Sequence, residues 1–207
     1  YEEDRTRQPS VFSVIRKIFE LFHSDDPYLG LYGAFGYDLV YQFENINPKH
    51  KRDKEQADCH LFLPVELVVV DRQKEEAFKI EYHIDTPDGM TESWWNTGEI
   101  FPIISAKVDG IIKCDHEEGE FEEKVLEIKD GCKKGDFYEV VLSQSFSTAF
   151  SEKPSTLFER ICAQNPSPYS FLINLGTEQL VGASPEMYVR VKSKRFETRP
   201  ISGTVPI

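Results

Sequence analysis

The chain has 207 residues, of which 40% are hydrophobic, and its formal net charge at pH 7 is -12. The apolar residues suffice for one substantial core or for a large part of a bigger domain. An acidic chain repels a phosphate backbone and an anionic membrane surface, so the composition argues against binding of nucleic acid or membranes. An anionic ligand would need local amide donors, a basic residue or a metal ion.

The four cysteines lie far apart without a C-x-x-C pair, which indicates reduced thiols in a cytoplasmic protein rather than a disulfide framework. Two of them stand near histidine, in Cys59-His60 and in Cys114-Asp115-His116. Neither group has a second ligand pair at zinc-finger spacing, so the sequence predicts no zinc site. The start without methionine and the end after "GTVPI" lead us to expect a fragment of a longer protein.

In the first half of the chain, apolar residues at helical spacing predict a helix over residues 10–23, with Ser10 as its N-cap. Next, "LGLYGAFGYDLVYQFE" carries three glycines spaced three residues apart. No Lys-Ser/Thr follows them, which excludes a phosphate loop, so we predict a strand through Tyr37 with close sheet packing or a bulge at glycine. "LFLPVELVVVDR" and "AFKIEYHI" predict two strands around a turn at residues 72–75.

In the second half, "GEFEEKVLEIKDGCKKGD" predicts a helix with acids in its first turn, lysines in its last and Gly135 at its end. A strand over residues 137–146 follows, and then a helix in "STLFERICAQ", where Thr156 and Glu159 fit a capping box. The remaining strands are expected in antiparallel hairpins, at residues 169–175, 180–183, 187–191 and 195–198. The predicted class is α+β, with extensive antiparallel sheet packed with helices.

Two carboxylates are candidates for chemistry. Glu139 lies on the less apolar face of its predicted strand, and this pattern favours a solvated side chain. Glu186 follows Pro185 at a corner between strands, where a carboxyl held partly out of water could donate a proton. An exposed turn acid fits the spacing at Glu186 equally well.

Two further segments could contact a ligand. Gly203 and Thr204, in "PISGT", could bring backbone amides and a hydroxyl close to a substrate carboxylate, although an ordinary turn is the commoner reading. "NPSPYSF" could form a rigid aromatic wall for a planar ligand, although its pattern also fits the start of a buried strand. This segment comprises Asn165, Pro166, Ser167, Pro168, Tyr169, Ser170 and Phe171.

Four motifs, "GDFYEVVLSQSF", "NPSPYSFLINL", "LVGASPEMYVRV" and "ETRPISGT", occur in the order found in the chorismate-utilising enzymes. The chain resembles that family over nearly its whole length. It is most similar to the large, ammonia-using subunits of anthranilate synthases of the type fused to a glutamine amidotransferase. The resemblance implies one incomplete chorismate-binding domain over residues 1–207, with an N-terminal part at 1–115 and the start of the core at 116–207.

The resemblance also implies roles for individual residues. Glu186 corresponds to the acid that protonates the departing C4 hydroxyl of chorismate, and Gly203 and Thr204 correspond to a substrate contact. Glu139 stands where water-using relatives carry a lysine base and ammonia-using relatives usually carry glutamine. The segment from Asn165 to Phe171 matches the feedback site for tryptophan, with Ser170 where methionine is common.

The family further implies Mg2+ and a histidine for pyruvate elimination, with their residues expected beyond residue 207. We therefore predict that residues 1–207 alone are inactive. Expected partners are chorismate, ammonia from a glutamine amidotransferase domain or subunit, tryptophan as feedback inhibitor and a possible second copy. The alternatives are 2-amino-2-deoxyisochorismate synthase, aminodeoxychorismate synthase (disfavoured by Ser202 in place of lysine) and a non-catalytic fragment that binds tryptophan or an amidotransferase.

Overall fold

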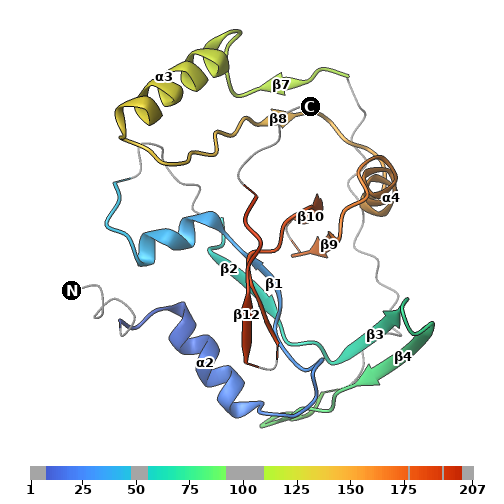
Figure 1. Ribbon diagram of the computed structural model, residues 1–207. Helices are drawn as coiled ribbons and strands as arrows, with labels where there is room; N and C mark the ends of the chain where they lie inside the picture. The colour runs from blue at the N-terminus through green and yellow to red at the C-terminus, as the bar shows by residue number, and fades with distance from the viewer. Residues whose placement is uncertain (1–7, 48–55, 92–109, 177, 193, 202–207) are drawn as a thin grey trace. The chain divides into compact units, whose positions relative to one another are not determined.

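The computed structural model describes residues 8–47, 56–91, 110–176, 178–192 and 194–201 (Figure 1). The chain forms two compact units, residues 1–100 and 101–207. Helices and antiparallel strand pairs occur in both units, so the predicted α+β class is confirmed. The assignment of residues 1–207 to one incomplete domain stays a prediction. Within the described ranges, no helix has the length and apolar character needed to cross a membrane.

In the first unit, helix α2 (Val11–Leu21) starts after Ser10 as predicted. The Ser13 hydroxyl accepts the backbone N–H of Ser10 at 3.2 Å, which satisfies a donor at the helix start. Phe12 packs its ring against Phe35 and Phe43, with ring centroids 5.7 and 5.8 Å away. This aromatic cluster joins the apolar face of α2 to the strand that follows it.

Strand β1 (Tyr32–Phe35) pairs antiparallel with β2 (Cys59–Phe62). At Gly33, φ is +156° and an added methyl carbon would lie 2.0 Å from the carbonyl oxygen of His60. Two backbones therefore approach each other at a position that only glycine can occupy. The predicted close packing at glycine is confirmed here.

The strand prediction was wrong at Tyr37, which begins the 3₁₀ helix η1 (Tyr37–Gln42). The Gly36 N–H donates to the carbonyl of Asp58 at 2.8 Å, and the chain then turns so that the Leu39 N–H donates back to Gly36 at 3.2 Å. The turn buries Leu39 and leaves Tyr37 exposed. An alternating apolar pattern does not distinguish these two conformations over so short a run.

Strands β3 (Glu66–Asp71) and β4 (Glu76–Glu81) form the predicted antiparallel hairpin. Asp71 Oδ1 accepts the backbone N–H groups of Gln73 and Lys74 at 3.0 and 3.1 Å, which closes the turn. These bonds, led by the one from Lys74, hold the pKa of Asp71 below its usual value. Strands β5 (Asp85–Thr86) and β6 (Gly89–Met90) make a second, short hairpin.

A tyrosine hydroxyl ties this hairpin region to the loop after α2. Tyr82 donates to Asp26 Oδ2 at 2.8 Å, and burial together with this hydrogen bond raises the pKa of Tyr82 to about 12. A raised pKa stabilises the folded state below the unfolded value of about 10, and that contribution is lost as pH rises from about 10 through about 12.

We therefore expect Tyr82→Phe to lower the free energy of unfolding by about 1 kcal/mol at neutral pH, the net value of one hydrogen bond. Urea unfolding should show this difference from wild type shrinking as pH rises from about 10 to about 12. Tyr37→Phe, at an exposed position, is the matched control and should change neither quantity. A difference that grows with pH would contradict the assignment.

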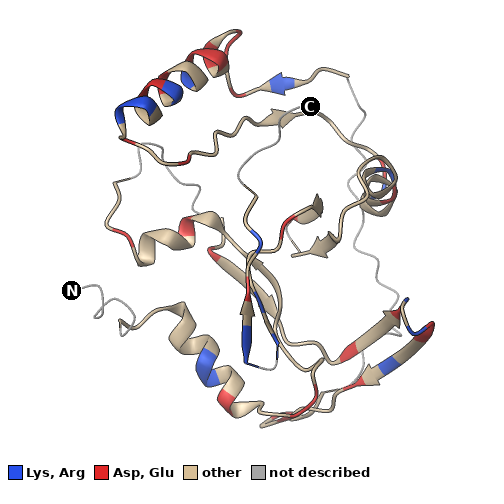
Figure 2. Ribbon diagram, viewed as in Figure 1, with Lys and Arg blue, Asp and Glu red and all other residues tan. Residues whose placement is uncertain are grey.

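In the second unit, β7 (Lys113–Cys114) pairs antiparallel with β8 (Phe146–Ser147), and helix α3 (Glu120–Lys134) lies between them in the chain. Acids occupy the first turn of α3 and lysines its last, which suits the helix dipole (Figure 2). Gly135 ends the helix in the left-handed conformation with φ of +85°. Each feature agrees with the predicted helix.

The strand predicted over residues 137–146 was wrong for most of its length. Residues 137–145 are not in a strand, and Tyr138 is fully exposed. A strand needs a partner ladder, and in the described part of the chain the pairing partner β7 reaches only Phe146 and Ser147. The β-branched and aromatic composition alone could not show where the pairing begins.

Helix α4 (Pro154–Gln164) starts one residue earlier than predicted, with Lys153 at the N-cap. The capping box at Thr156 was wrong, because Pro154 occupies the first helical position and Thr156 already donates its N–H to Lys153 at 2.9 Å. Helix α4 contacts the hairpin of β9 (Tyr169–Asn174) and β10 (Gln179–Ser184). The hairpin itself is as predicted.

The last hairpin pairs β11 (Arg190–Lys192) with β12 (Arg195–Glu197). Strand β11 begins three residues later than predicted, because residues 187–189 form the end of the corner that follows β10. Met187 is buried in this corner. The antiparallel pairing confirms the predicted hairpin order.

Candidate functional site

The corner after β10 is held by a serine hydroxyl. Ser184 Oγ donates to the backbone carbonyl of Glu186 at 2.9 Å and accepts the Glu186 N–H at 3.2 Å. Pro185, between them, offers no backbone donor and restricts φ. These contacts fix the backbone of Glu186. The sequence interpretation missed the serine, although a hydroxyl two residues before the turned amide was the available signal.

The Glu186 side chain is exposed, but it points at a specific segment. Its Oε1 accepts the backbone N–H of Ile201 at 3.1 Å, across fifteen residues of chain. Ile201 immediately precedes Ser202, Gly203 and Thr204 in the sequence. The structure therefore brings the carboxylate of "SPE" to the start of "ISGT". Gly203 and Thr204 themselves lie outside the described residues.

The β11–β12 hairpin closes the loop between these two motifs. Glu197 binds the guanidinium groups of Arg190 and Arg199, and the Thr198 hydroxyl donates to the carbonyl of Tyr188 at 3.0 Å. The hydrogen bond from Arg190, followed by that from Arg199, holds the pKa of Glu197 below its usual value. The charged Glu197 thus stabilises the β11–β12 pair, and the chain that follows β12 places Ile201 next to Glu186.

The segment from Asn165 to Phe171 reaches the same end of the β9–β10 hairpin. In the strand register Tyr169 lies opposite Ser184, and Phe171 lies opposite Gly182. A methyl carbon at Gly182 would lie 2.3 Å from the Phe171 ring, so the ring packs directly over this glycine. Sequence spacing treated "NPSPY" and "SPE" as separate candidates. The register places them side by side.

The first residues of this segment form a compact turn. Asn165 ends α4, and its carbonyl accepts the hydroxyl of Ser167 at 3.2 Å. The Ser170 hydroxyl donates to the carbonyl of Ser167 at 3.2 Å, which ties the start of β9 to the turn. Ser170 therefore has a structural contact of its own. Pro166 and Pro168 lie in the same turn.

Glu139 is not brought to this corner by any described contact. It is exposed on the irregular segment that follows α3, and no described residue forms a hydrogen bond or ion pair with its side chain. The prediction that it lies on one face of a strand was wrong, because residues 137–145 are not paired. The solvated carboxylate favoured by its pattern agrees with this exposure.

The match with known proteins covers the whole site. The family model described as chorismate binding enzyme matches residues 2–207. The chain belongs to the chorismate binding enzyme family. The resemblance inferred from the four ordered motifs is confirmed.

Three relatives within this family illustrate the match. The chain is 45% identical to a protein named anthranilate synthase from Azospirillum brasilense, over 98% of this chain and 28% of that protein. It is 30% identical to aminodeoxychorismate synthase component 1 of Salmonella typhimurium, over 86% and 38%. Among solved structures, anthranilate synthase component I from Streptococcus pneumoniae matches with a TM-score of 0.64 at 25% identity, over 86% of this chain and 45% of that one. The chain thus spans less than half of these proteins.

The described residues of the corner do not fit the Mg2+ that the family resemblance implies. Mg2+ needs several oxygen ligands in near-octahedral geometry. At this corner Glu186 offers a carboxylate, whereas the oxygens of Glu197 are bonded to Arg190 and Arg199. Among the described residues, the corner therefore lacks a set of Mg2+ ligands, and the ligands implied by the resemblance are expected beyond residue 207.

Proposed function

We propose that the protein carrying this chain is an anthranilate synthase, which converts chorismate and ammonia to anthranilate and pyruvate. The observation that supports this most is the carboxylate of Glu186, which accepts the N–H of Ile201, the residue that leads into Gly203 and Thr204 in the sequence. The 45% identity to a protein of that name adds to it. The whole reaction belongs to the complete protein.

In the proposed first step, the nitrogen of ammonia adds at C2 of the chorismate ring and the C4 hydroxyl leaves as water. Glu186 supplies the proton that the leaving hydroxyl needs, and the ammonium formed at C2 returns a proton to solvent or to a base. One oxygen of Glu186 is held by Ile201, so Oε2 is the oxygen proposed to donate. Elimination of pyruvate and aromatisation of the ring then give anthranilate.

Ammonia rather than water is the proposed nucleophile, because Glu139 stands where water-using relatives carry a lysine base. A glutamine amidotransferase domain or subunit is the proposed source of ammonia, and the cytoplasm the proposed location. Tryptophan is proposed to inhibit at the segment from Asn165 to Phe171, whose register neighbour Ser184 sets the corner of Glu186. Tryptophan bound at this segment would therefore lie next to the strand end that positions the Glu186 carboxylate.

The test is product identification by mass spectrometry, using the complete protein with chorismate and an ammonium salt. We expect anthranilate and pyruvate in equal amounts. Accumulation of 2-amino-2-deoxyisochorismate without pyruvate would contradict the second step and support the synthase that stops there. An amine at C4 would support aminodeoxychorismate synthase, against which Ser202 argues because relatives of that type usually carry lysine at this position.

A non-catalytic role requires a separate measurement. Calorimetry with tryptophan on residues 1–207 and on the complete protein, beside activity assays of both, distinguishes the cases. If the complete protein binds tryptophan but shows no turnover of chorismate, a non-catalytic, regulatory role is supported. The inactivity of residues 1–207 alone stays a prediction, which the same assays test.

A further inference from the structure

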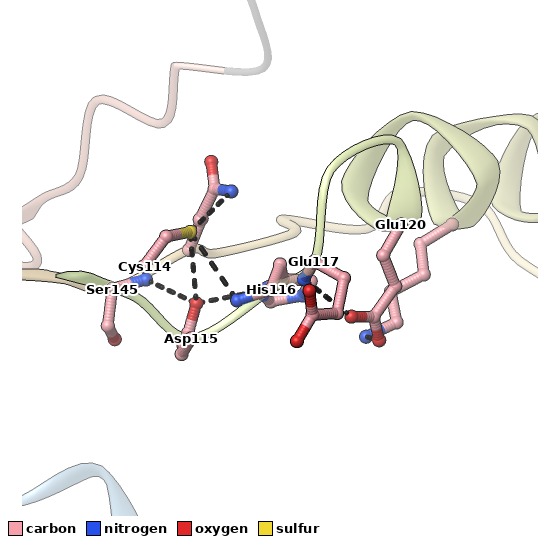
Figure 3. Close-up of polar contacts among 8 residues, drawn as sticks. Cys114, Asp115, His116, Glu117, Glu120 and Ser145 are labelled. Carbon is pink, nitrogen blue, oxygen red and sulfur yellow. Dashed lines mark hydrogen bonds and ion pairs between the residues drawn. The ribbon is translucent and has the colours of Figure 1, made fainter.

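Three metal-ligand side chains converge where β7 leads into α3, on elements that the proposed chemistry does not use. Cys114, Asp115 and His116 present a sulfur, a carboxylate oxygen and a ring nitrogen, all within 4.8 Å of one another. Figure 3 shows one carboxylate oxygen of Asp115 joined by dashed lines to the cysteine sulfur and to the histidine. Among the residues that the structure describes, no other three metal-ligand side chains come this close together.

The carboxylate and the ring are already held in place. Asp115 Oδ1 accepts the backbone N–H of Ser145 at 3.0 Å and lies 2.6 Å from His116 Nδ1. The His116 side chain is only 11% exposed, and its ring meets Phe121 edge-to-face with centroids 5.8 Å apart. Little conformational freedom therefore remains to be lost when these donors bind a ligand.

Two N–H groups donate to the Cys114 sulfur. Cys114 Sγ accepts the backbone N–H of His116 at 3.4 Å and the side-chain amide of Gln144 at 3.0 Å (Figure 3). N–H donors around a thiolate stabilise its negative charge, and outer-shell partners of this kind support metal ligands in general. Cys114 is exposed, so an ion can reach it from solvent.

We propose that Cys114, Asp115 and His116 bind one Zn2+ ion. Sulfur and imidazole nitrogen with one carboxylate suit zinc, whereas Mg2+ and Ca2+ prefer oxygen ligands alone. The site is not a zinc finger, since its ligands are consecutive and the fourth position is left to water.

Small movements suffice for the two ligand pairs that include the Asp115 carboxylate, and the sulfur and ring nitrogen lie within 4.8 Å of each other. Tetrahedral zinc places its nitrogen and oxygen ligands roughly 3.4 Å apart and its sulfur and oxygen ligands roughly 3.6 Å apart. Sγ and Oδ1 of residues 114 and 115 are 3.9 Å apart, and Oδ1 and Nδ1 of residues 115 and 116 are 2.6 Å apart. Zinc therefore requires Nδ1 and Oδ1 to separate by less than about 1 Å.

The proton balance follows from the donors. The Cys114 thiol loses its proton to solvent as the sulfur–zinc bond forms. His116 binds zinc through Nδ1 as the neutral ring with its proton on Nε2, so the contact between Nδ1 and Oδ1 is replaced by two bonds to the ion. The bound ion would link three residues of the β7–α3 connection and would stabilise this unit by mass action. Gln144 and Ser145, which precede β8, donate hydrogen bonds to two of the ligands.

The experiment uses the complete protein, freed of metal by chelation and kept in excess Mg2+ so that oxygen-only sites are filled. Titration with Co2+ should give one equivalent of binding with a thiolate-to-cobalt charge-transfer absorption, which Zn2+ then displaces. Cys114→Ser should abolish that absorption and weaken zinc binding by at least about 100-fold. Gln144→Ala, which removes only an outer-shell donor, should weaken it by about 10- to 100-fold.

Cys59→Ser is the matched control, because Cys59 also precedes a histidine, and it should leave the absorption unchanged. Far-ultraviolet circular dichroism checks that each variant is folded. If the absorption persists in Cys114→Ser, or never appears in the wild-type protein at millimolar Co2+, the zinc site is wrong. Cobalt binding without charge transfer would also overturn it, because the sulfur would then not be a ligand.

Discussion

Replacing Glu186 with glutamine in the complete protein is expected to lower kcat with chorismate and an ammonium salt by about 10²- to 10⁴-fold. Glutamine keeps an oxygen that can accept the N–H of Ile201, so the corner should retain its geometry. The amide cannot give a proton to the departing hydroxyl. The loss should therefore appear mainly in kcat, with little change in KM.

Glu178→Gln is the control for this variant, because Glu178 lies in the exposed turn between β9 and β10 and is outside the proposed machinery. Its kcat should equal that of wild type. Steady-state anthranilate fluorescence and pyruvate release measure both variants. Turnover of Glu186→Gln at the wild-type rate would remove Glu186 from the acid role, whatever the product of the reaction.

The hydrogen bonds at this corner explain what the sequence could and could not predict. Pro185 indicated a turn before Glu186, and the structure contains that turn. Neither the Ser184 hydroxyl nor the Ile201 amide was predictable as a partner, because the second contact depends on how a later hairpin returns the chain. Local turn chemistry is encoded in neighbouring residues, whereas this closure depends on residues fifteen positions away.

The errors in secondary structure have a related cause. Helix α3 was predictable because its apolar spacing, its end charges and Gly135 all indicate the same element. The segment 137–145 has a strand-like composition, but strand formation depends on a partner that the segment does not specify. For the same reason the sequence did not predict that "NPSPY" and "SPE" are neighbours. Their proximity follows from the strand pairing, which places Tyr169 opposite Ser184.

Among the glycines at positions 30, 33 and 36, Gly33 is expected to tolerate substitution least. Gly33→Ala should lower the free energy of unfolding by about 3 kcal/mol or more, because the new methyl combines steric overlap with a strained backbone. At φ of +156° that methyl would lie 2.0 Å from the His60 carbonyl oxygen. Relief requires separation of β1 from β2, so the loss should be visible in urea unfolding of the complete protein.

The neighbouring glycines make a graded control series. A methyl at Gly30 meets nothing within 4 Å among the described atoms, and one at Gly36 lies 3.0 Å from the carbonyl oxygen of Ala57. Gly30→Ala should therefore change stability by no more than about 0.5 kcal/mol, with Gly36→Ala between the extremes. Equal losses at all three positions would indicate a general backbone effect and contradict the steric explanation. The expected ranking of stabilities follows from the close contact between β2 and Gly33, which Gly30 lacks. A phosphate-binding role for the glycines would not produce this ranking.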